Sequence, residues 1–333
     1  MDFRFTSEQV LIQDNARNFL QARASSERLR STLASETGWD EALWHAMGAE
    51  LGWPGVALPE AVGGRGLGMV ELAILMHETG RVLAATPFFT SAGLCAPAIL
   101  AVATAAQQAA LLPDLACGKT KYALCLSGAR GTPAPLDLPC VLLLRGGAAM
   151  LRGVAHFVAF GHVADRLLVM ARAPGSVGWD GVSLVAVPAN APGVRIERVV
   201  SLDLTRPYAT VHFQGVSVAT DSILGTVEAA GPAVKLALAS AATMLAAEQL
   251  GGAERVLEVS VDYAKQREQF GRPIGSFQAV KHILAEMKLL VEGARAAAYY
   301  AACAMVELPD EREEAAAIAR SYCSDAFCTC AGQ

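Results

Sequence analysis

The sequence carries little charge and few aromatic residues. Charged residues make up 18% and aromatic residues 6% of the 333 positions, and the formal net charge is only −5. A nucleic-acid-binding protein would be expected to carry a basic patch or stripe, so that class is not favoured. The first residues hold no apolar signal core, and apolar stretches such as 234–247 are too short and too rich in alanine to span a bilayer. We therefore expect a cytoplasmic protein that binds neither nucleic acid nor membranes.

The eight cysteines are scattered and form no small-domain disulfide pattern, which favours a reducing compartment. Cys323, Cys328 and Cys330 cluster near the end of the sequence. A metal site would want a fourth ligand and tighter cysteine pairs, and no histidine lies nearby. We interpret these cysteines as small residues that pack between helices, because free cysteine is commonly buried. No metal site is predicted.

Three regions of the chain differ in pattern. Residues 1–120 are predicted to be helical, with a capping box at Thr6 and Gln9 and further helices over 41–51 and 69–84. Residues 121–225 contain short apolar runs (141–144, 167–170 and 182–187) separated by Gly, Pro, Asp and Asn, a pattern typical of β-strands. Residues 226–333 are predicted to be helical again, over 231–265, 277–307 and 311–330.

These patterns predict an α+β fold with three domains in the order α, β, α. The N-terminal helical domain spans 1–120, the middle β-barrel or sandwich domain 121–225, and the C-terminal domain, which resembles a four-helix bundle, 226–333. Hydrophobic residues form 53% of the chain, enough for a large core or an extensive subunit interface.

One stretch, residues 263–282, offers chemistry suited to a phosphorylated ligand. Arg267 is predicted to lie at a helix end before the turn Phe270-Gly271, where a guanidinium fork can reach a diphosphate. Phe270 offers an aromatic face, and the Gln278 side chain can hydrogen-bond to a ring or a ribityl group. The plain alternative is a two-helix hairpin with a surface arginine, a turn phenylalanine and a helical glutamine.

This stretch resembles the helix–turn–helix signature of the acyl-CoA dehydrogenase family. Residues 51–53 (Leu-Gly-Trp), 58–60 (Leu-Pro-Glu) and the glycine cluster at 63–68 are similar to the first domain of the same family. The resemblance implies an FAD-dependent enzyme that removes hydrogen from Cα and Cβ of an acyl-CoA thioester. It also implies an oligomer, since the matching Arg and Gln contact the FAD of a neighbouring subunit, and it makes an electron-transfer flavoprotein the expected electron acceptor.

The middle domain departs from the family pattern. Where the family carries a Thr-Glu-Pro-x-x-Gly-Ser-Asp-like segment, this chain has residues 124–133, and where the family carries Trp-Ile-Thr it has residues 157–160. Ser127 and Phe157 are the substitutes that could still contact flavin. The altered segments resemble those of heteromeric members, such as heterotetramers, which in bacteria often act on steroid side-chain esters of CoA. In these members one subunit type keeps the arginine signature and another completes the site.

Proton removal from Cα needs a carboxylate as base. The sequence contains no Tyr-Glu-Gly segment, where the family's commonest base lies, and Ala241 occupies the position used by some relatives. Glu248 is the only ionisable residue between Lys235 and Glu254, and we predict it as the catalytic base. The alternative is a buried ion pair of Glu248 with Arg255 or with an arginine of another subunit.

Three functional hypotheses remain open. The chain could be a subunit of a heteromeric dehydrogenase, a homo-oligomeric dehydrogenase acting alone, or a non-catalytic partner that supplies Arg267, Phe270 and Gln278 to the flavin of a homologous chain. His77, Glu78 and His282 are interpreted as packing or interface groups.

Overall fold

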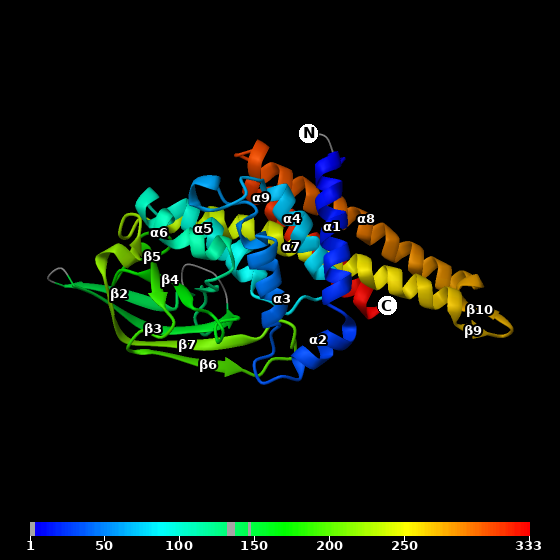
Figure 1. Cartoon of the computed structure of the whole chain (residues 1–333), viewed down its shortest axis with the longest axis horizontal. Coiled ribbons are helices and arrows are strands. Elements are labelled where there is room, and N and C mark those ends of the chain that lie inside the picture. The colour runs from blue at the N-terminus through cyan, green and yellow to red at the C-terminus, as the bar shows by residue number, and fades with distance from the viewer. Residues whose placement is uncertain (1–3, 132–136, 146–147) are drawn as a thin grey trace. The chain divides into compact units, whose positions relative to one another are not determined.

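A computed structural model describes residues 4–131, 137–145 and 148–333 (Figure 1). Helices are followed by a sheet and then by further helices, so the predicted α+β fold is confirmed. The chain divides into two compact units. Unit 1 comprises Met1–Leu29, Gly68–Ala84 and Ala242–Gln333; unit 2 comprises Arg30–Leu67 and Ala85–Ala241.

Unit 1 is helical. Its helices are α1 (Ser7–Arg23), α4 (Met69–Arg81), α8 (Gln278–Glu307), α9 (Arg312–Gly332) and the larger part of α7 (Gly231–Gln266), and α2 (Ser26–Leu33) follows α1 in the chain. The predicted capping box is confirmed: the Thr6 hydroxyl accepts a hydrogen bond from the backbone N–H of Gln9, and the Gln9 side chain accepts one from the backbone N–H of Thr6. Two orphan N–H groups at the start of α1 are thereby satisfied.

Helices α4 and α7 cross in very close contact, and a glycine on each side permits it. A Cβ atom added to Gly80 of α4 would lie 2.0 Å from the backbone oxygen of Glu248, and one added to Gly251 of α7 would lie 1.9 Å from the backbone oxygen of His77. Neither backbone can accept a side chain at that distance. The two glycines therefore bring the polar residues of α4 next to those of α7.

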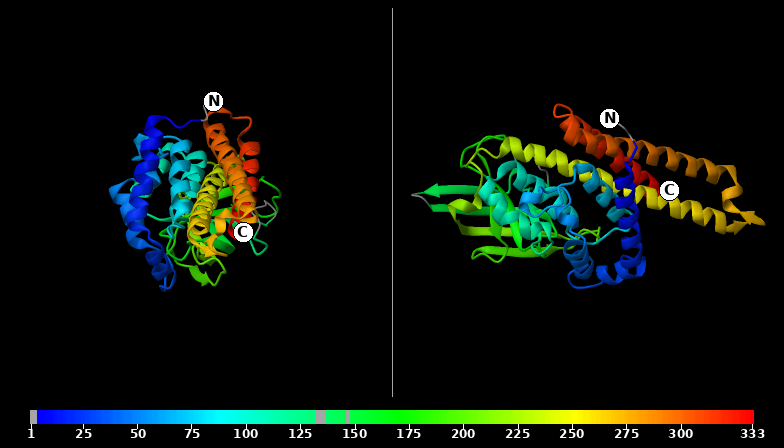
Figure 2. Two further views of the ribbon diagram at one scale, coloured as in Figure 1. Left: turned by 90° about the vertical axis from the view of Figure 1, so that its right-hand side faces the viewer. Right: turned by 45° about the horizontal axis from the view of Figure 1, so that its top comes forward.

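The core of the C-terminal helices is built from small residues, which let the helices approach closely. Ala294, Ala298 and Ala301 of α8 and Cys323 and Cys330 of α9 are among its buried members. Helices α8 and α9 lie side by side (Figure 2). The packing prediction is confirmed for Cys323 and Cys330, whereas Cys328 is exposed. Helix α8 is long and apolar enough to cross a membrane by length and composition alone, and 44% of its apolar window is buried within the protein.

The helices of unit 2 are short. They are α3 (Glu41–His45), α5 (Ala96–Val102) and α6 (Ala105–Ala116). The predicted helix over 41–51 begins as expected with the Asp40 carboxylate accepting from Leu43 N–H, but continues as a π-helical turn over Ala46–Glu50. It ends at Gly52, whose φ of +67° favours glycine.

The remainder of unit 2 is a β-sheet. Its strands are β1 (Tyr122–Cys125), β2 (Cys140–Arg145), β3 (Ala148–Ala159), β4 (Arg166–Arg172), β5 (Val182–Pro188), β6 (Val194–Val199), β7 (Tyr208–Val218) and β8 (Ile223–Leu224). The strand order is β6-β7-β3-β2-β4-β5-β8, and β1 pairs with β4 in parallel. The predicted runs 141–144, 167–170 and 182–187 all lie in strands.

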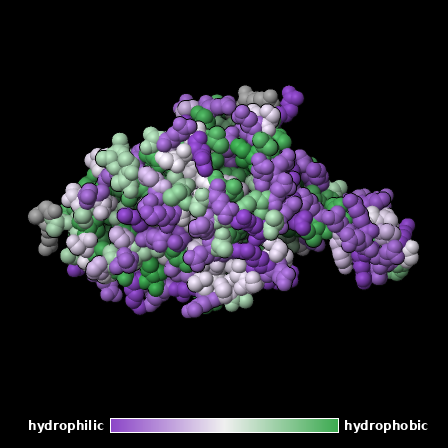
Figure 3. Space-filling model, in the orientation of Figure 1, coloured by the Kyte–Doolittle hydropathy of each residue, from purple (hydrophilic) through white to green (hydrophobic). Residues whose placement is uncertain are grey.

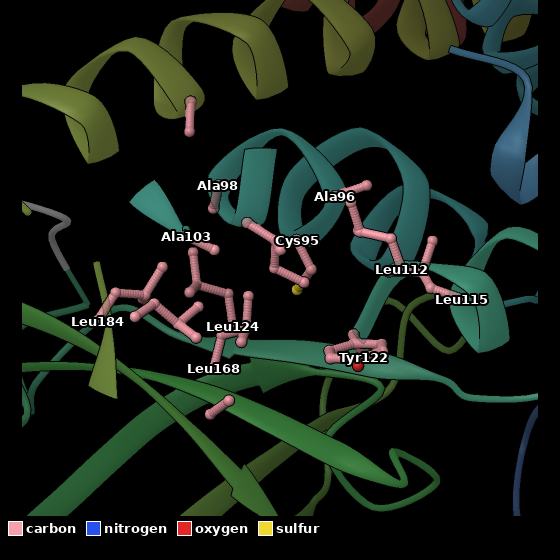
Figure 4. Packing of buried hydrophobic residues seen from close by; sticks show 14 of the residues in the cluster. Cys95, Ala96, Ala98, Ala103, Leu112, Leu115, Tyr122, Leu124, Leu168 and Leu184 are labelled. Atoms are coloured by element: carbon pink, nitrogen blue, oxygen red, sulfur yellow. The ribbon is translucent and has the colours of Figure 1, made fainter. Parts of the chain in front are cut away.

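Side chains alternate between the two faces of this sheet, as a two-residue period requires. On one face Leu168 and Leu184 join a core shared with α5, α6 and the first turns of α7 (Figure 4). On the other face Leu167, Val169 and Val185 join a second core. Strands β4 and β5 are therefore buried on both faces, which explains their nearly continuous apolar sequence.

Candidate functional site

The predicted cofactor-binding stretch forms a hairpin between α7 and α8. Strands β9 (Glu268–Gln269) and β10 (Arg272–Pro273) pair antiparallel, and the backbone N–H of Ile274 donates to the Arg267 carbonyl oxygen at 2.8 Å. The Arg272 guanidinium lies 4.2 Å from the centre of the Phe277 ring. The hairpin lies at the end of the α7–α8 pair (Figure 2), and the molecular surface at that end is mainly hydrophilic (Figure 3).

Phe270 adopts an unusual backbone conformation at the tip of this hairpin. Phe270 has φ +54° and Gly271 φ +73°, so both central residues of the turn are left-handed, as a type I′ turn requires. Glycine accepts this conformation without strain, but a side chain costs about 1–2 kcal/mol there. The residue is nevertheless 92% exposed, and its ring meets the edge of the Phe277 ring with centroids 6.1 Å apart. A strained and exposed aromatic residue is a candidate for contact with a ligand or another chain.

Arg267 and Gln278 are also exposed, and Gln278 is the first residue of α8. The structure thus brings three of the predicted residues together on one hairpin and the helix that follows it. A guanidinium, an aromatic ring and an amide fit the diphosphate and ring groups of FAD in kind.

Ser127 and Phe157 lie together in unit 2. The His156 backbone N–H donates to the Ser127 carbonyl oxygen at 2.9 Å, so residue 127 is next to the strand that carries Phe157. Phe157 sits at an irregularity of β3 between Ala155 and Val158, with φ +55° and 52% of its surface exposed. The break in pairing turns this ring out of the sheet.

The loop after Ser127 uses its backbone donors internally. The N–H of Gly128 donates to the Asp137 carbonyl oxygen at 2.8 Å, and the N–H of Arg130 donates to the Asp137 carboxylate at 3.1 Å. Gly131 N–H donates to Gly128 at 3.2 Å. Thr132 and Pro133, the last residues of the predicted flavin segment, lie outside the described residues. Within the described part of this loop, the Ser127 hydroxyl and the Phe157 ring beside it are the groups predicted to contact FAD.

Glu248 lies on α7 at the crossing with α4, and its side chain is half-buried. Arg255, its suggested partner, forms an ion pair with Glu258 at 3.2 Å. Glu254, six residues further along α7, has a side chain that is 16% exposed and forms ion pairs with His77 and Arg81. This carboxylate was not singled out from the sequence.

Glu254 belongs to a network of charged side chains that joins four helices of unit 1 and is buried at its centre, around His77 and Glu78. His77 Nε2 lies 2.7 Å from Glu254 Oε2, and His77 Nδ1 lies 3.0 Å from Glu78 Oε1. Arg17 of α1 donates twice to Glu78, at 3.1 and 2.7 Å, and Arg81 donates to Glu254 at 2.8 Å. The network is completed by Glu258 of α7, bonded to Arg81, and by Arg295 of α8, bonded to Glu254.

The network shifts the pKa values of its members in the direction that ion pairing predicts. Burial opposes charging of all three central groups, but the two carboxylates outweigh it at His77 and raise the pKa of that imidazole. His77 and Arg17 lower the pKa of Glu78, and His77 and Arg295 lower the pKa of Glu254. The interpretation of His77 and Glu78 as packing groups agrees with their burial. The sequence signal was a His-Glu pair inside an apolar helix, but its partners Arg17 and Glu254 lie 61 and more than 170 residues away.

Comparison with known proteins gives the class of this chain. The model of the acyl-CoA dehydrogenase N-terminal domain matches residues 6–119, and that of the acyl-CoA dehydrogenase C-terminal domain matches residues 232–333. Together they cover more than half of the chain. The protein belongs to the acyl-CoA dehydrogenase family, as the sequence resemblance predicted, and is an oxidoreductase of that family.

Individual relatives include heteromeric members. The chain is 30% identical over 289 residues to acyl-CoA dehydrogenase IpdE2 of Mycobacterium tuberculosis, which covers 87% of this chain and 74% of that protein. It is similar to the ChsE4–ChsE5 complex from Mycobacterium tuberculosis (TM-score 0.88, 27% identity, covering 100% of this chain and 86% of that one). A variant of the Tcur3481–Tcur3483 steroid ACAD gives a TM-score of 0.86 at 33% identity, covering 98% and 85%.

Proposed function

We propose that this chain is one subunit of a heteromeric acyl-CoA dehydrogenase, which removes hydrogen from Cα and Cβ of a bulky acyl-CoA ester and binds FAD between chains. The exposed, strained Phe270 beside Arg267 is the observation that carries the proposal. A residue held in a costly conformation at a hairpin tip, with its ring in solvent, suits a contact that another chain or its cofactor completes.

The two units contribute differently to this proposal. Arg267, Phe270 and Gln278 of unit 1 present a charge, a ring and an amide outward, and in the assembled enzyme they would hold the cofactor of the neighbouring chain. In the Ser127 loop of unit 2, the backbone N–H groups of Gly128 and Arg130 donate to Asp137 and that of Gly131 donates to Gly128. A chain in which one unit is better suited to cofactor binding than the other can work in a heteromeric assembly, because another chain supplies the missing contacts. This supports a hetero-oligomer over a homo-oligomer. The similarity to ChsE4–ChsE5 and to a steroid ACAD favours a steroid-like substrate.

Glu248 remains our candidate for the base that takes the Cα proton. Glu248 is half-buried, close enough to solvent for its carboxylate to release a proton after reaction, and its backbone oxygen faces Gly80 at the helix crossing. Bound FAD supplies the hydride acceptor, and an electron-transfer flavoprotein is the expected acceptor thereafter. The second candidate function is a non-catalytic partner subunit in the cytoplasm, and the hydrogen bonds that the Gly128 and Arg130 N–H groups already make to Asp137 favour it.

Flavin content tests the proposal. The chain is purified alone and after co-expression with a homologous subunit, and FAD is counted per chain by absorbance. We expect little flavin alone and retained flavin with the partner, and Arg267→Gln should reduce that content at least tenfold. Lys281→Gln, an exposed cation one turn into α8, is the matched control. Equal flavin content in the Arg267 and Lys281 variants would refute the cofactor role of the hairpin.

Turnover distinguishes a catalytic subunit from a non-catalytic partner subunit. In the flavin-loaded assembly, Glu248→Gln should abolish bleaching of the flavin by an acyl-CoA while flavin content is unchanged. Full bleaching in that variant would assign the base to another residue and leave this chain as the supporting partner.

A further inference from the structure

Phe277 lies at the centre of a row of three side chains on the hairpin between α7 and α8. Its ring stands nearly perpendicular to the ring of Phe270, at an interplanar angle of 85° with centroids 6.1 Å apart. The Arg272 guanidinium lies over the Phe277 ring, 4.2 Å from its centre, which is within the range of a cation–π contact. Phe277 is half-buried, whereas Phe270 and Arg272 are exposed. The row therefore joins Phe270, which is predicted to contact the cofactor, to two residues that are not.

The main chain fixes the position of Phe277. As the N-cap of α8 it is extended, with φ −82° and ψ 137°. Its N–H donates to the carbonyl oxygen of Ile274 at 3.1 Å, and its own carbonyl oxygen accepts from the N–H of Lys281 at 3.1 Å. The Ile274 N–H in turn donates to the Arg267 carbonyl oxygen at 2.8 Å. These bonds join backbone atoms, so a substitution at position 277 changes the ring contacts and leaves the hydrogen bonds in place.

The orientation of the Phe270 ring depends on its neighbours in the hairpin. Phe270 is 92% exposed, and a Cβ atom added to the adjacent Gly271 would meet nothing within 4 Å. An exposed side chain exchanges rapidly among staggered rotamers unless a neighbour restrains it. The contact with Phe277 favours one orientation of the Phe270 ring, and Arg272 restrains Phe277 in turn. A ring that is already held in one orientation loses less conformational freedom when it meets a ligand.

We infer that Phe277 is a positioning residue: with Arg272 packed on its face, it holds the Phe270 ring in the orientation in which the hairpin contacts FAD. The inference rests on the proposed function of the hairpin, and it adds two residues that act through Phe270. Removal of the Phe277 ring should therefore weaken FAD retention, although it removes no group that is predicted to touch the cofactor.

The side-chain NMR signals of Arg272 test the geometry in the chain without flavin. Ring currents move the signals of protons above an aromatic face upfield, so Arg272 in arginine-labelled protein should resonate upfield of the exposed arginines. Arg272→Gln assigns the signal by removing it. Phe277→Leu should return the signal to the range of the exposed arginines, whereas Phe277→Tyr, which keeps the ring, should leave it upfield.

The rate of FAD loss tests the consequence in the co-expressed assembly, measured by the fluorescence of FAD released on dilution. Phe277→Leu should speed FAD loss about two- to tenfold, the range that an edge-to-face ring pair supports, and Phe277→Tyr should not. Combining Phe270→Leu with Phe277→Leu should speed it no further than Phe270→Leu alone, because residues that act through one contact are not additive.

The matched control is Phe19→Leu on α1, where the Arg23 guanidinium lies 5.1 Å from the centre of the Phe19 ring. This change removes a contact of the same kind away from the hairpin and should leave FAD loss unchanged. Thermal unfolding of each variant checks that the fold is retained.

The outcomes separate the positioning role from the proposed function. An Arg272 signal in the range of the exposed arginines, or one that Phe277→Leu does not move, overturns the inference whether or not the assembly holds flavin. Equal FAD loss in Phe277→Leu and Phe19→Leu overturns it too, and if Arg267→Gln still releases FAD, the proposed function stands without it. Unchanged flavin content in Arg267→Gln would refute the proposed function itself, and the inference with it.

Discussion

Replacing Glu78 by glutamine should destabilise unit 1 more than any other single change in its charge network. The Glu78 side chain is 1% exposed and accepts from Arg17 at 3.1 and 2.7 Å, with His77 Nδ1 at 3.0 Å. The substitution keeps the volume of the side chain but leaves those cations without their shared carboxylate. Breaking a buried ion pair by removing one partner costs about 3–5 kcal/mol.

The lower end of that range applies here. The Arg17 side chain is 34% exposed, so water recovers part of the lost interaction. We therefore expect a loss of about 3 kcal/mol, which corresponds to a shift of about 1 M in the urea midpoint at an m-value of about 3 kcal/mol/M. The pKa of Glu78 is lowered in the folded state. Its contribution is present above about pH 4.5 and fades as the pH falls through the folded value.

The assay is urea unfolding followed by far-UV circular dichroism, which reports the helices. Tryptophan fluorescence is unsuitable because Trp39, Trp44, Trp53 and Trp179 all lie in unit 2. The control is Glu258→Gln, whose side chain is 40% exposed and should cost about 1 kcal/mol or less. Equal losses for the two variants at pH 6, or a loss for Glu78→Gln that does not shrink at pH 3, would refute the reasoning.

Three further predictions concern residues of unit 1. The pKa of His77 is raised in the folded state, so this residue stabilises the fold fully below about pH 6.5, and the stabilisation is lost as the pH rises through the folded-state pKa. In urea titrations of the parent protein the unfolding free energy should therefore decline between about pH 6.5 and pH 9, and His77→Gln should flatten that decline. Gly80→Ala should lower the melting temperature although alanine favours helices by about 1 kcal/mol, because its Cβ would lie 2.0 Å from the Glu248 oxygen; Gly332→Ala, which has open space, is the control. Phe270→Gly should raise the unfolding free energy by about 1 kcal/mol by releasing the left-handed strain, yet lower FAD retention in the assembled enzyme; unchanged FAD retention would contradict a role for the ring.

Local signals were sufficient to predict most elements of the fold. The Thr6–Gln9 capping box marked the start of α1, and Pro232 and Pro309 lie at the limits of the two long helical regions. The short apolar runs marked β2, β4 and β5, since residues buried on both faces of a sheet need no polar alternation. The π-helical turn over Ala46–Glu50 has no such signal, because its residues are compatible with an ordinary helix.

The candidate site was predictable only in part. The Arg267–Gln278 stretch is contiguous, so its residue types and spacing could be interpreted directly. The charge network joins residues from α1, α4, α7 and α8, and its geometry depends on a helix crossing set by Gly80 and Gly251. An isolated carboxylate in an apolar run led to the prediction of Glu248, whereas the ion-pair network forms on Glu254, six residues further along α7.

The two-sided burial of β4 and β5 limits how the middle sheet can be modified. A one-residue slip of either strand would exchange the side chains of two differently shaped cores, so register drift and polar substitutions are penalised on both faces. The turn between these strands is different, since Gly175 and Gly178 have open space around them. An affinity tag or reporter domain inserted at Gly175 would avoid Trp179, which lies later in the turn and packs against the first core, so Gly175 is the natural place to label this protein for assembly measurements.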